Sequence, residues 1–292
     1  MNGVEREVNE AWQVGKVKIT RVVEMEVTGG TRFILPDATR EAVRDYRWLY
    51  PHFMDEEGNL VMSIHALVVD TGERRIVVDT CIGNDKQRAI PTWSNLQTSF
   101  LADLGSAGYP RSSIDTVLCT HLHVDHVGWN TMLLEGEWIP TFGRARYLVA
   151  ETEWRYWKDV DSSRDVLADS VRPVLDAGLV DFVPMDHRLC DEVWLEPTPG
   201  HTPGHVSVRI ASEGEEALIT GDCIHHPCQM TRTDWCSSAD YDQVQGRHTR
   251  EALLERYVDS EVLVIGTHFA TPTAGYVERR VAGGYWLRVP DS

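Results

Sequence analysis

One segment, THLHVDHVGWN (residues 120–130), constrains what this chain can fold into more than any other, because it gathers three histidines and an aspartate within six positions. It continues a short apolar run, DTVLCT (115–120), that is typical of a buried strand. The candidate metal ligands in it are His121, His123, Asp125 and His126. A lone histidine would be an ordinary core or surface residue. Four ligand-type residues at one strand end predict a sheet that holds its loops rigidly around a metal ion.

Three further strand-like segments lead into residues of the same types. They are EVWLEP (192–197), which precedes TPGHTPGH, then EALITGD (216–222) and EVLVIGTH (261–268). The candidate ligands they add are His201, His205, Asp222 and His268. A tetrahedral zinc ion takes four ligands, so a set of this size suits two ions. A carboxylate has two oxygens, and Asp222 is therefore the natural bridge between them.

The remaining pattern predicts an α+β chain. Apolar runs at 16–27, 63–70, 74–80, 146–150, 179–184 and 205–210 are predicted strands, and helices are predicted at 94–108, from about 151, at 163–177 and near 248–258. Strands outnumber helices and several are apolar on both faces, which favours two sheets packed face to face with helices outside. No linker or repeat divides the chain, so we expect one domain over 1–292, with the aromatic tract 29–62 as an excursion over the site.

In order, the motifs H-L-H-V-D-H, TPGHTPGH, Gly221-Asp222 and Gly266-Thr-His268 resemble those of the metallo-β-lactamase superfamily. That resemblance implies an αβ/βα four-layer sandwich with a dinuclear site at the sheet edges. It implies that His121, His123 and His205 hold one metal, that Asp125, His126 and His268 hold the second, and that Asp222 bridges them. His201 is then a supporting residue. Zinc is the expected metal, with manganese, cobalt or iron as alternatives.

Within that superfamily the chain is similar to the branch of N-acyl homoserine lactonases and methyl parathion hydrolase, notably in GDCIHHPCQ (221–229). The resemblance implies a hydrolase in which a metal-bridging hydroxide attacks a lactone or carboxylic ester. Asp125 and Asp222 are the expected catalytic residues, and Asp125 orients the hydroxide and carries its proton. The alternatives are a phosphotriester hydrolase of the methyl parathion hydrolase type and a mononuclear iron dioxygenase similar to persulfide dioxygenases.

Affinity for an apolar substrate requires aromatic walls beside the metals. The tract 29–62 is the expected supplier, in this chain or from a neighbouring subunit of a homodimer. The predicted pocket residues are Trp48, Tyr50, Phe53, Trp93, His225 and His226. For the two histidines, facing the substrate and packing behind the site are equally open.

The net charge of −17 argues against nucleic acid as a partner and favours a neutral small molecule. No apolar stretch reaches the length of a membrane span. The N-terminal residues carry charges where an export signal needs an apolar run, so we expect a cytoplasmic protein with reduced cysteines. Cys223, next to Asp222, is left open as a further ligand.

Overall fold

The structure, a computed structural model, describes residues 10–290 of the chain. In this range the strands form two large mixed sheets and one hairpin. The first sheet has the order β1-β2-β3-β4-β5-β8-β9, with β1 Ala11–Val14, β2 Val17–Thr28, β3 Val61–Asp70, β4 Arg75–Val78, β5 Thr116–Cys119, β8 Arg146–Ala150 and β9 Val180–Val183. The second has the order β10-β11-β12-β13-β14-β15, with β10 Val193–Pro197, β11 Val206–Ser212, β12 Glu215–Ile219, β13 Leu263–Ile265, β14 Ala274–Arg279 and β15 Tyr285–Arg288. The hairpin pairs β6 Thr131–Leu134 with β7 Glu137–Pro140.

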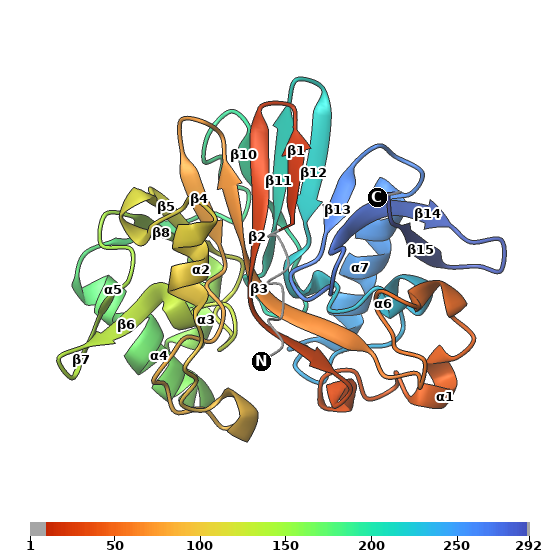
Figure 1. The fold of residues 1–292 in the computed structure, drawn as a ribbon, viewed down its shortest axis with the longest axis horizontal. Helices are drawn as coiled ribbons and strands as arrows, with labels where there is room; N and C mark the ends of the chain where they lie inside the picture. Colours follow the sequence, from red (N-terminus) through yellow and green to blue (C-terminus); the bar gives the residue numbers. More distant parts are fainter. Residues whose placement is uncertain (1–9, 291–292) are drawn as a thin grey trace, which may run out of the picture.

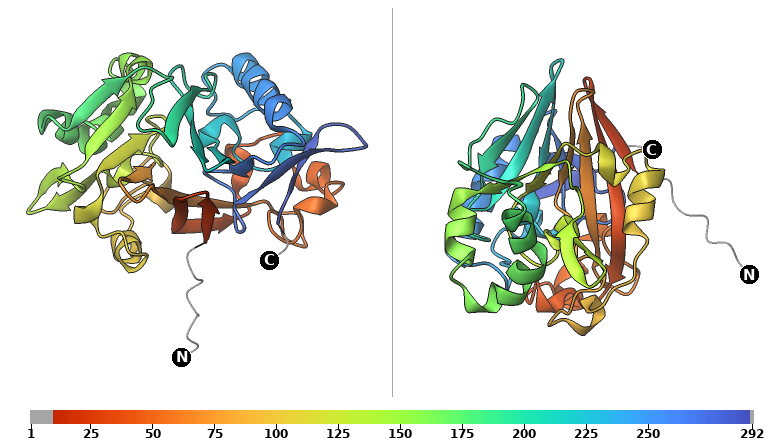
Figure 2. Two further views of the ribbon diagram at one scale, coloured as in Figure 1. Left: turned by 90° about the horizontal axis from the view of Figure 1, so that it is seen from above. Right: turned by 90° about the vertical axis from the view of Figure 1, so that its left-hand side faces the viewer.

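The helices lie on the outer faces of the two sheets (Figures 1 and 2). They are α1 Arg40–Val43, α2 Phe100–Ser106, α3 Glu151–Trp157, α4 Arg164–Ser170, α5 Arg172–Asp176, α6 Cys228–Thr231 and α7 Gln243–Tyr257. The 3-10 turns η1 Thr31–Phe33, η2 Arg47–Leu49, η3 Pro91–Trp93 and η7 Gly221–Cys223 lie in the connections discussed below. Helices α2 to α5 cover the first sheet, and α6 and α7 cover the second.

The four layers follow from strand periodicity, because successive side chains of a strand point to opposite faces. In β3, Val68 belongs to the apolar cluster beneath the helices of the first sheet, whereas Leu67 and Val69 belong to the cluster between the sheets. In β12, Ile219 faces the other sheet and Leu218 faces α7. Strand segments buried on both faces, such as residues 66–69 of β3, are predominantly apolar, as the sequence pattern predicted. The expected α+β sandwich is confirmed.

Three predicted helices differ from those observed, and the one expected near 248–258 begins earlier, at Gln243. The helix expected at 94–108 begins only at Phe100, because residues 94–98 form a connection in which the Asn84 amide oxygen accepts the backbone N–H of Thr98. The helix expected at 163–177 is two helices, α4 and α5, interrupted at Val171. Pro173 lacks an N–H and favours the first turn of a new helix over continuation of the old one. Strands β1, β6, β7, β14 and β15 had no counterpart in the sequence reading.

The tract 29–62 does not lie over the site as a whole. Between Leu35 and Leu60 its apolar side chains are buried in a third cluster, against α6, α7 and the second sheet. The isolated bridge between Met54 and Leu60 closes this excursion before β3 begins. Most of the tract therefore extends the core of the second sheet, which leaves its first residues, 29–34, and Met62 at its end near the metal ligands.

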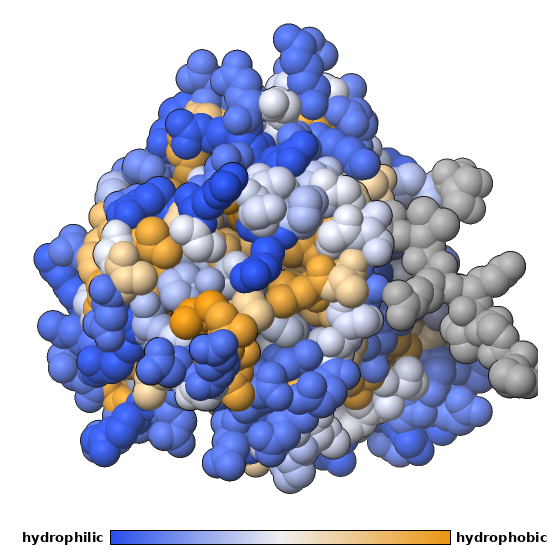
Figure 3. Space-filling view, turned by 60° about the vertical axis from the view of Figure 1, so that its left-hand side comes forward, coloured by the Kyte–Doolittle hydropathy of each residue, from blue (hydrophilic) through white to orange (hydrophobic). Residues whose placement is uncertain are grey.

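The outer surface is largely hydrophilic on the face shown in Figure 3, with smaller hydrophobic areas between. Over residues 10–290, none of the helices is long and apolar enough to cross a membrane.

Candidate metal centre

The candidate ligands come together at one edge of the sandwich. His121 to His126 follow β5, Asp222 follows β12 in η7, and His268 follows β13. The strands β12 and β13 are parallel, so their carboxyl ends lie at the same edge. The loop between β10 and β11, which carries His201, supplies the fourth connection. Ligands far apart in sequence therefore converge because both sheets end there.

One group of ring nitrogens and a carboxylate contains three histidines and Asp222. The Nδ1 of His123 lies 3.0 Å from Nε2 of His121 and 2.9 Å from Nε2 of His201. Oδ2 of Asp222 lies 3.4 Å from Nε2 of His201 and 3.8 Å from Nε2 of His121. Each of the four residues contributes one ligand atom, and these atoms all lie within 4.8 Å of one another.

A second group contains Asp125, His126 and His268. The Nε2 atoms of His126 and His268 are 3.2 Å apart, and Asp125 oxygens lie 3.8 Å and 3.6 Å from them. Asp222 also reaches this group: Oδ1 lies 3.2 Å from Nε2 of His268, and Oδ2 lies 3.3 Å from Nε2 of His126. The Asp222 carboxylate thus lies between the two groups.

These distances fit divalent ions. Zinc binds imidazole nitrogen at about 2.0–2.1 Å, so two ligand atoms on one tetrahedral ion lie about 3.3 Å apart. Between the histidines of each group, the nitrogen–nitrogen distances are within a few tenths of an ångström of that value. Neutral imidazoles and carboxylates, buried and turned toward one another, are the donor set that such ions bind.

Hydrogen bonds on the far side of the ring orient His126, His201 and His268. Nδ1 of His126 faces Oδ2 of Asp79 at 2.8 Å, and Nδ1 of His201 faces Oδ1 of Asp240 at 2.8 Å. Nδ1 of His268 donates to the Ser63 carbonyl at 3.0 Å. A metal-binding histidine characteristically uses its other nitrogen in this way, which fixes the ring and leaves a lone pair toward the ion.

The structure corrects the prediction for His205. Its Nε2 accepts the backbone N–H of Asp222 at 2.8 Å, and its Nδ1 faces the Thr198 carbonyl at 3.0 Å. Both nitrogens are occupied, so His205 supports Asp222 from behind. His201 occupies the ligand position that was predicted for His205. His205 directly precedes β11 and is held at the sheet, whereas His201 lies in the middle of the loop. The ring also requires Gly221, since a Cβ there would lie 2.5 Å from Nε2 of His205.

The electrostatics differ between the two groups: the first favours neutral rings beside a charged carboxylate, whereas in the second, although burial opposes it, the Asp222 carboxylate raises the pKa values of His126 and His268. Burial holds the pKa values of His121, His123 and His201 well below the usual range, which keeps their lone pairs free. Burial would raise the pKa of Asp222, but the surrounding histidines, led by His126, hold it well below its usual range. By contrast, burial raises the pKa of Cys223 to about 12, and its side chain packs in the third apolar cluster, away from this group.

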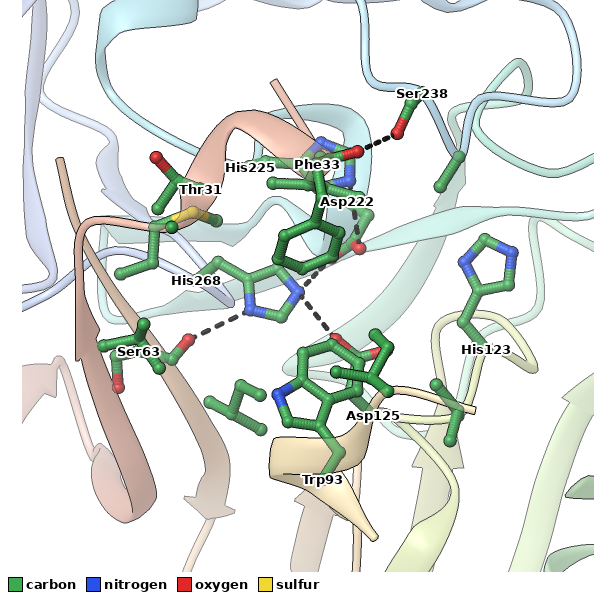
Figure 4. A pocket seen from close by; sticks show the side chains of 18 of the residues that line it. Thr31, Phe33, Ser63, Trp93, His123, Asp125, Asp222, His225, Ser238 and His268 are labelled. Carbon is green, nitrogen blue, oxygen red and sulfur yellow. Dashed lines mark hydrogen bonds and ion pairs between the residues drawn. The ribbon is translucent and has the colours of Figure 1, made fainter. Parts of the chain in front are cut away.

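A cavity of about 520 Å³ opens onto the centre (Figure 4). Its polar wall includes His123, Asp125, His201, Asp222, His225 and His268. Its apolar wall includes Val27, Phe33, Ile34, Met62, Ile64, Ile90 and Trp93. The rings of Phe33 and Trp93 meet edge to face, with centroids 6.1 Å apart. In Figure 4 these two rings lie in front of His268 and Asp125.

Of the predicted pocket residues, the structure places Trp93 and His225 in the cavity lining and the others elsewhere. Phe53 is fully buried against Phe269, with ring centroids 6.2 Å apart. Trp48 packs against Trp286, and the hydroxyl of Tyr50 donates to Glu56.

The two neighbouring histidines are placed differently. His226 is packed behind the site, and its Nε2 donates to the Phe53 carbonyl at 2.8 Å. His225 lines the cavity, and its Nε2 lies 3.3 Å from Oδ2 of Asp222. Sequence reasoning did not single out Phe33, although it lies in the tract 29–62 from which the aromatic wall was expected.

Comparisons with known proteins agree with this geometry. The model of the metallo-beta-lactamase superfamily matches residues 60–275. A probable metallo-hydrolase of Mycobacterium tuberculosis is 24% identical over 236 residues, covering 72% of this chain and 75% of that protein. An N-acyl homoserine lactonase of Bacillus sp. is 30% identical over 110 residues, covering 38% of each chain.

Solved structures share the fold over nearly the whole chain. Hydrolase AbOPH of the beta-lactamase superfamily superposes with a TM-score of 0.80 at 23% identity, covering 98% of this chain and 100% of that one. AidC, a dizinc quorum-quenching lactonase solved with its product, superposes with a TM-score of 0.78 at 19% identity, covering 97% of both. With the ordered motifs, the two-sheet sandwich and the family match in agreement, this chain belongs to the metallo-beta-lactamase superfamily.

Proposed function

We propose that this protein is a dinuclear-metal hydrolase that cleaves neutral carboxylic esters or lactones bearing an apolar group. The observation that carries this proposal is the cavity, in which the ligand groups face an apolar wall. Within the described residues, its lining includes neither Lys nor Arg. A substrate phosphate or free carboxylate would therefore find no side-chain cation to pair with, whereas an alkyl or acyl group would be well accommodated.

Two ions are proposed because Asp222 has an oxygen within 3.4 Å of ring nitrogens in both groups. His121, His123 and His201 would hold one ion, and Asp125, His126 and His268 the other. Zinc is the proposed metal for this histidine-rich set, and manganese, cobalt and iron are the alternatives that such ligands also accept.

The bound ions would supply a nucleophile from water at neutral pH and polarise the substrate carbonyl. Asp125 lines the cavity, and its carboxylate can orient the attacking water, accept its proton and return that proton to the departing alkoxide oxygen. His225 lines the same cavity with its Nε2 3.3 Å from Oδ2 of Asp222, where its N–H would hold that carboxylate in place. Phe33 and Trp93 would hold the apolar group and exclude water from it.

The similarities support this choice among hydrolases. One neighbour is described as a lactonase with N-hexanoyl-L-homoserine as its product, and another similar protein is an N-acyl homoserine lactonase. Both names describe acyl-bearing lactones, which combine a carboxylic ester with an apolar chain.

A hydrolysis screen tests the proposal. Protein loaded separately with zinc, manganese and cobalt is assayed on acyl lactones of varied chain length, aryl esters, phosphotriesters and β-lactams. We expect kcat/KM to be highest for lactones or esters and to rise with chain length. The screen also includes Asp222→Asn, which changes the carboxylate shared by the two ligand groups. Its control is Asp45→Asn, which makes the same chemical change at an exposed position.

Other outcomes would redirect the assignment. Efficient cleavage of phosphotriesters with inactive ester and lactone panels would replace it with the phosphotriesterase alternative. One tightly bound iron per chain and oxygen consumption with a persulfide would favour the dioxygenase alternative.

A further inference from the structure

A buried carboxylate that is not itself a candidate ligand links two of the loops that carry the candidate ligands. Glu153 lies on α3, and its side chain is 1% exposed. Oε1 accepts the Leu122 backbone N–H at 3.0 Å, and Leu122 stands between His121 and His123. Oε2 accepts the Thr202 hydroxyl at 2.7 Å and the Gly204 backbone N–H at 2.9 Å. Thr202 directly follows His201.

The two loops belong to different sheets. The first follows β5 in the seven-stranded sheet, and the second joins β10 to β11 in the six-stranded sheet. The two ends of the Glu153 carboxylate therefore connect the two sheets at the edge where the ligands converge. Gly204 permits the approach, because a Cβ there would lie 2.2 Å from the Glu153 nitrogen.

A fourth donor connects Glu153 to His123. The indole Nε1 of Trp157 donates to Oε1 at 2.5 Å, and the Trp157 ring meets the His123 ring edge to face, with centroids 5.1 Å apart. All three histidines of the first group are thus adjacent to a residue that Glu153 holds, directly or through Trp157.

We infer that Glu153 is a positioning residue, which holds His201 in place relative to His121 and His123. This placement determines the metal affinity of this half of the centre. The inference rests on the proposed metal centre but not on the proposed substrate. The second half, Asp125, His126 and His268, has no contact with Glu153 among the hydrogen bonds of the described residues. Its affinity is expected to be unaffected.

The hydrogen-bond pattern explains why a carboxylate is needed. All four partners donate, and a carboxylate accepts at both oxygens, whereas glutamine offers one oxygen and an NH₂ group. An amide at Oε1 would face the N–H groups of Leu122 and Trp157, and neither can accept. An amide at Oε2 would face Thr202, which can accept, and Gly204, which cannot. Glu153→Gln should therefore adopt the second arrangement and loosen the loop that carries His201.

The experiment measures metal binding without substrate. Wild type, Glu153→Gln and Glu151→Gln are loaded with two equivalents of zinc and equilibrated with increasing chelator, and the ions retained per chain are counted. Glu151 lies on the same helix but is exposed and paired with Arg155, so it is a matched control. We expect Glu153→Gln to lose one ion at a chelator concentration about 10- to 100-fold lower than the wild type withstands. Its second ion and both ions of Glu151→Gln should follow the wild type.

A second measurement separates positioning from general stability. Melting temperatures are compared for metal-free and metal-loaded protein, because a bound ligand stabilises the folded state by an amount that grows with the logarithm of its affinity. Positioning predicts a smaller metal-induced increase in Glu153→Gln than in wild type. Equal losses in both states, with unchanged metal affinity, would overturn the inference.

If Glu153→Gln does not fold, Thr202→Val tests the inference in its place. It removes one of the four donors, leaves the helix intact and should weaken the same ion in the same direction. Wild-type affinity in that variant would overturn the inference, as would a wild type that binds no metal. A wild type that binds two ions but cleaves no ester or lactone would instead contradict the proposed function and leave the binding comparison decisive.

Discussion

The polar and apolar walls of the cavity are built in opposite ways. The polar wall is buried or half-buried, and two of its residues, His201 and His268, are oriented from behind by Asp240 and Ser63. The apolar wall combines residues of strands β2 and β3 with residues of surface connections, and Phe33 in one of these connections is 55% exposed. Ser238 ties this connection down, since its backbone N–H donates to the Ile34 carbonyl at 2.9 Å.

The difference separates two requirements. Chemistry at a metal needs ligand atoms placed within a few tenths of an ångström, which hydrogen bonds from the core provide. Recognition of an apolar group needs area and not a fixed position, and exposed loops provide it while tolerating change. Substitutions in the polar wall should therefore alter metal content, and substitutions in the apolar wall should alter KM.

The largest effect is expected at the centre of the polar wall. Asp222→Asn removes the charge shared by both ligand groups, so both ions should be lost at chelator concentrations that the wild type withstands. Loss of an orienting partner alone costs about 10- to 100-fold in activity, and loss of a shared ligand should exceed that. Metal counting and kcat/KM check this. Two tightly bound ions in the variant would show that Asp222 is not shared.

A large effect on stability is expected for Phe53, which lies behind the apolar wall. Phe53 was predicted from sequence to line the pocket, but it is fully buried. Phe53→Ala should destabilise the protein by about 3–5 kcal/mol, as core truncations of phenylalanine do. Denaturant unfolding measures this, and KM of the folded fraction should be unchanged for long and short substrates alike. A raised KM with wild-type stability would return Phe53 to the pocket.

The next comparison lies within TPGHTPGH. His201→Ala should reduce the retained ions from two to one, because its Nε2 faces the first ligand group. His205→Gln, which keeps an acceptor near the position of Nε2, should retain two. The two variants test the two histidines separately, and elemental analysis of the retained metal distinguishes them. The opposite result would restore the ligand assignment expected from sequence.

These variants also mark how far sequence reasoning reaches. The ligands after β5, β12 and β13 could be predicted, because strand ends bring such residues to one edge whatever the details of packing. His201 and His205 could not be distinguished, since both follow the same Thr-Pro-Gly and only the position relative to β11 separates them. The aromatic residues were assigned wrongly for a similar reason. Phe53 and Trp48 are covered by Phe269 and Trp286, which are more than two hundred positions away in sequence.

The smallest effect is expected at the mouth of the apolar wall. Phe33→Ala removes a ring that touches Trp93 and the cavity but contributes little to the core, so its stability should stay within about 0.5 kcal/mol of wild type. An aromatic contact of this kind contributes about 0.5–1.5 kcal/mol, which corresponds to an increase in KM of up to about tenfold for long acyl substrates. Short substrates, which do not reach the ring, should be cleaved with unchanged KM, and metal content should be that of wild type. Steady-state kinetics across a chain-length series is the measurement, with Phe182→Ala as control, because Phe182 is also partly exposed but lies in β9, outside the cavity lining. An equal change for short and long substrates, or a loss of metal, would mean that the two walls are not separable as described.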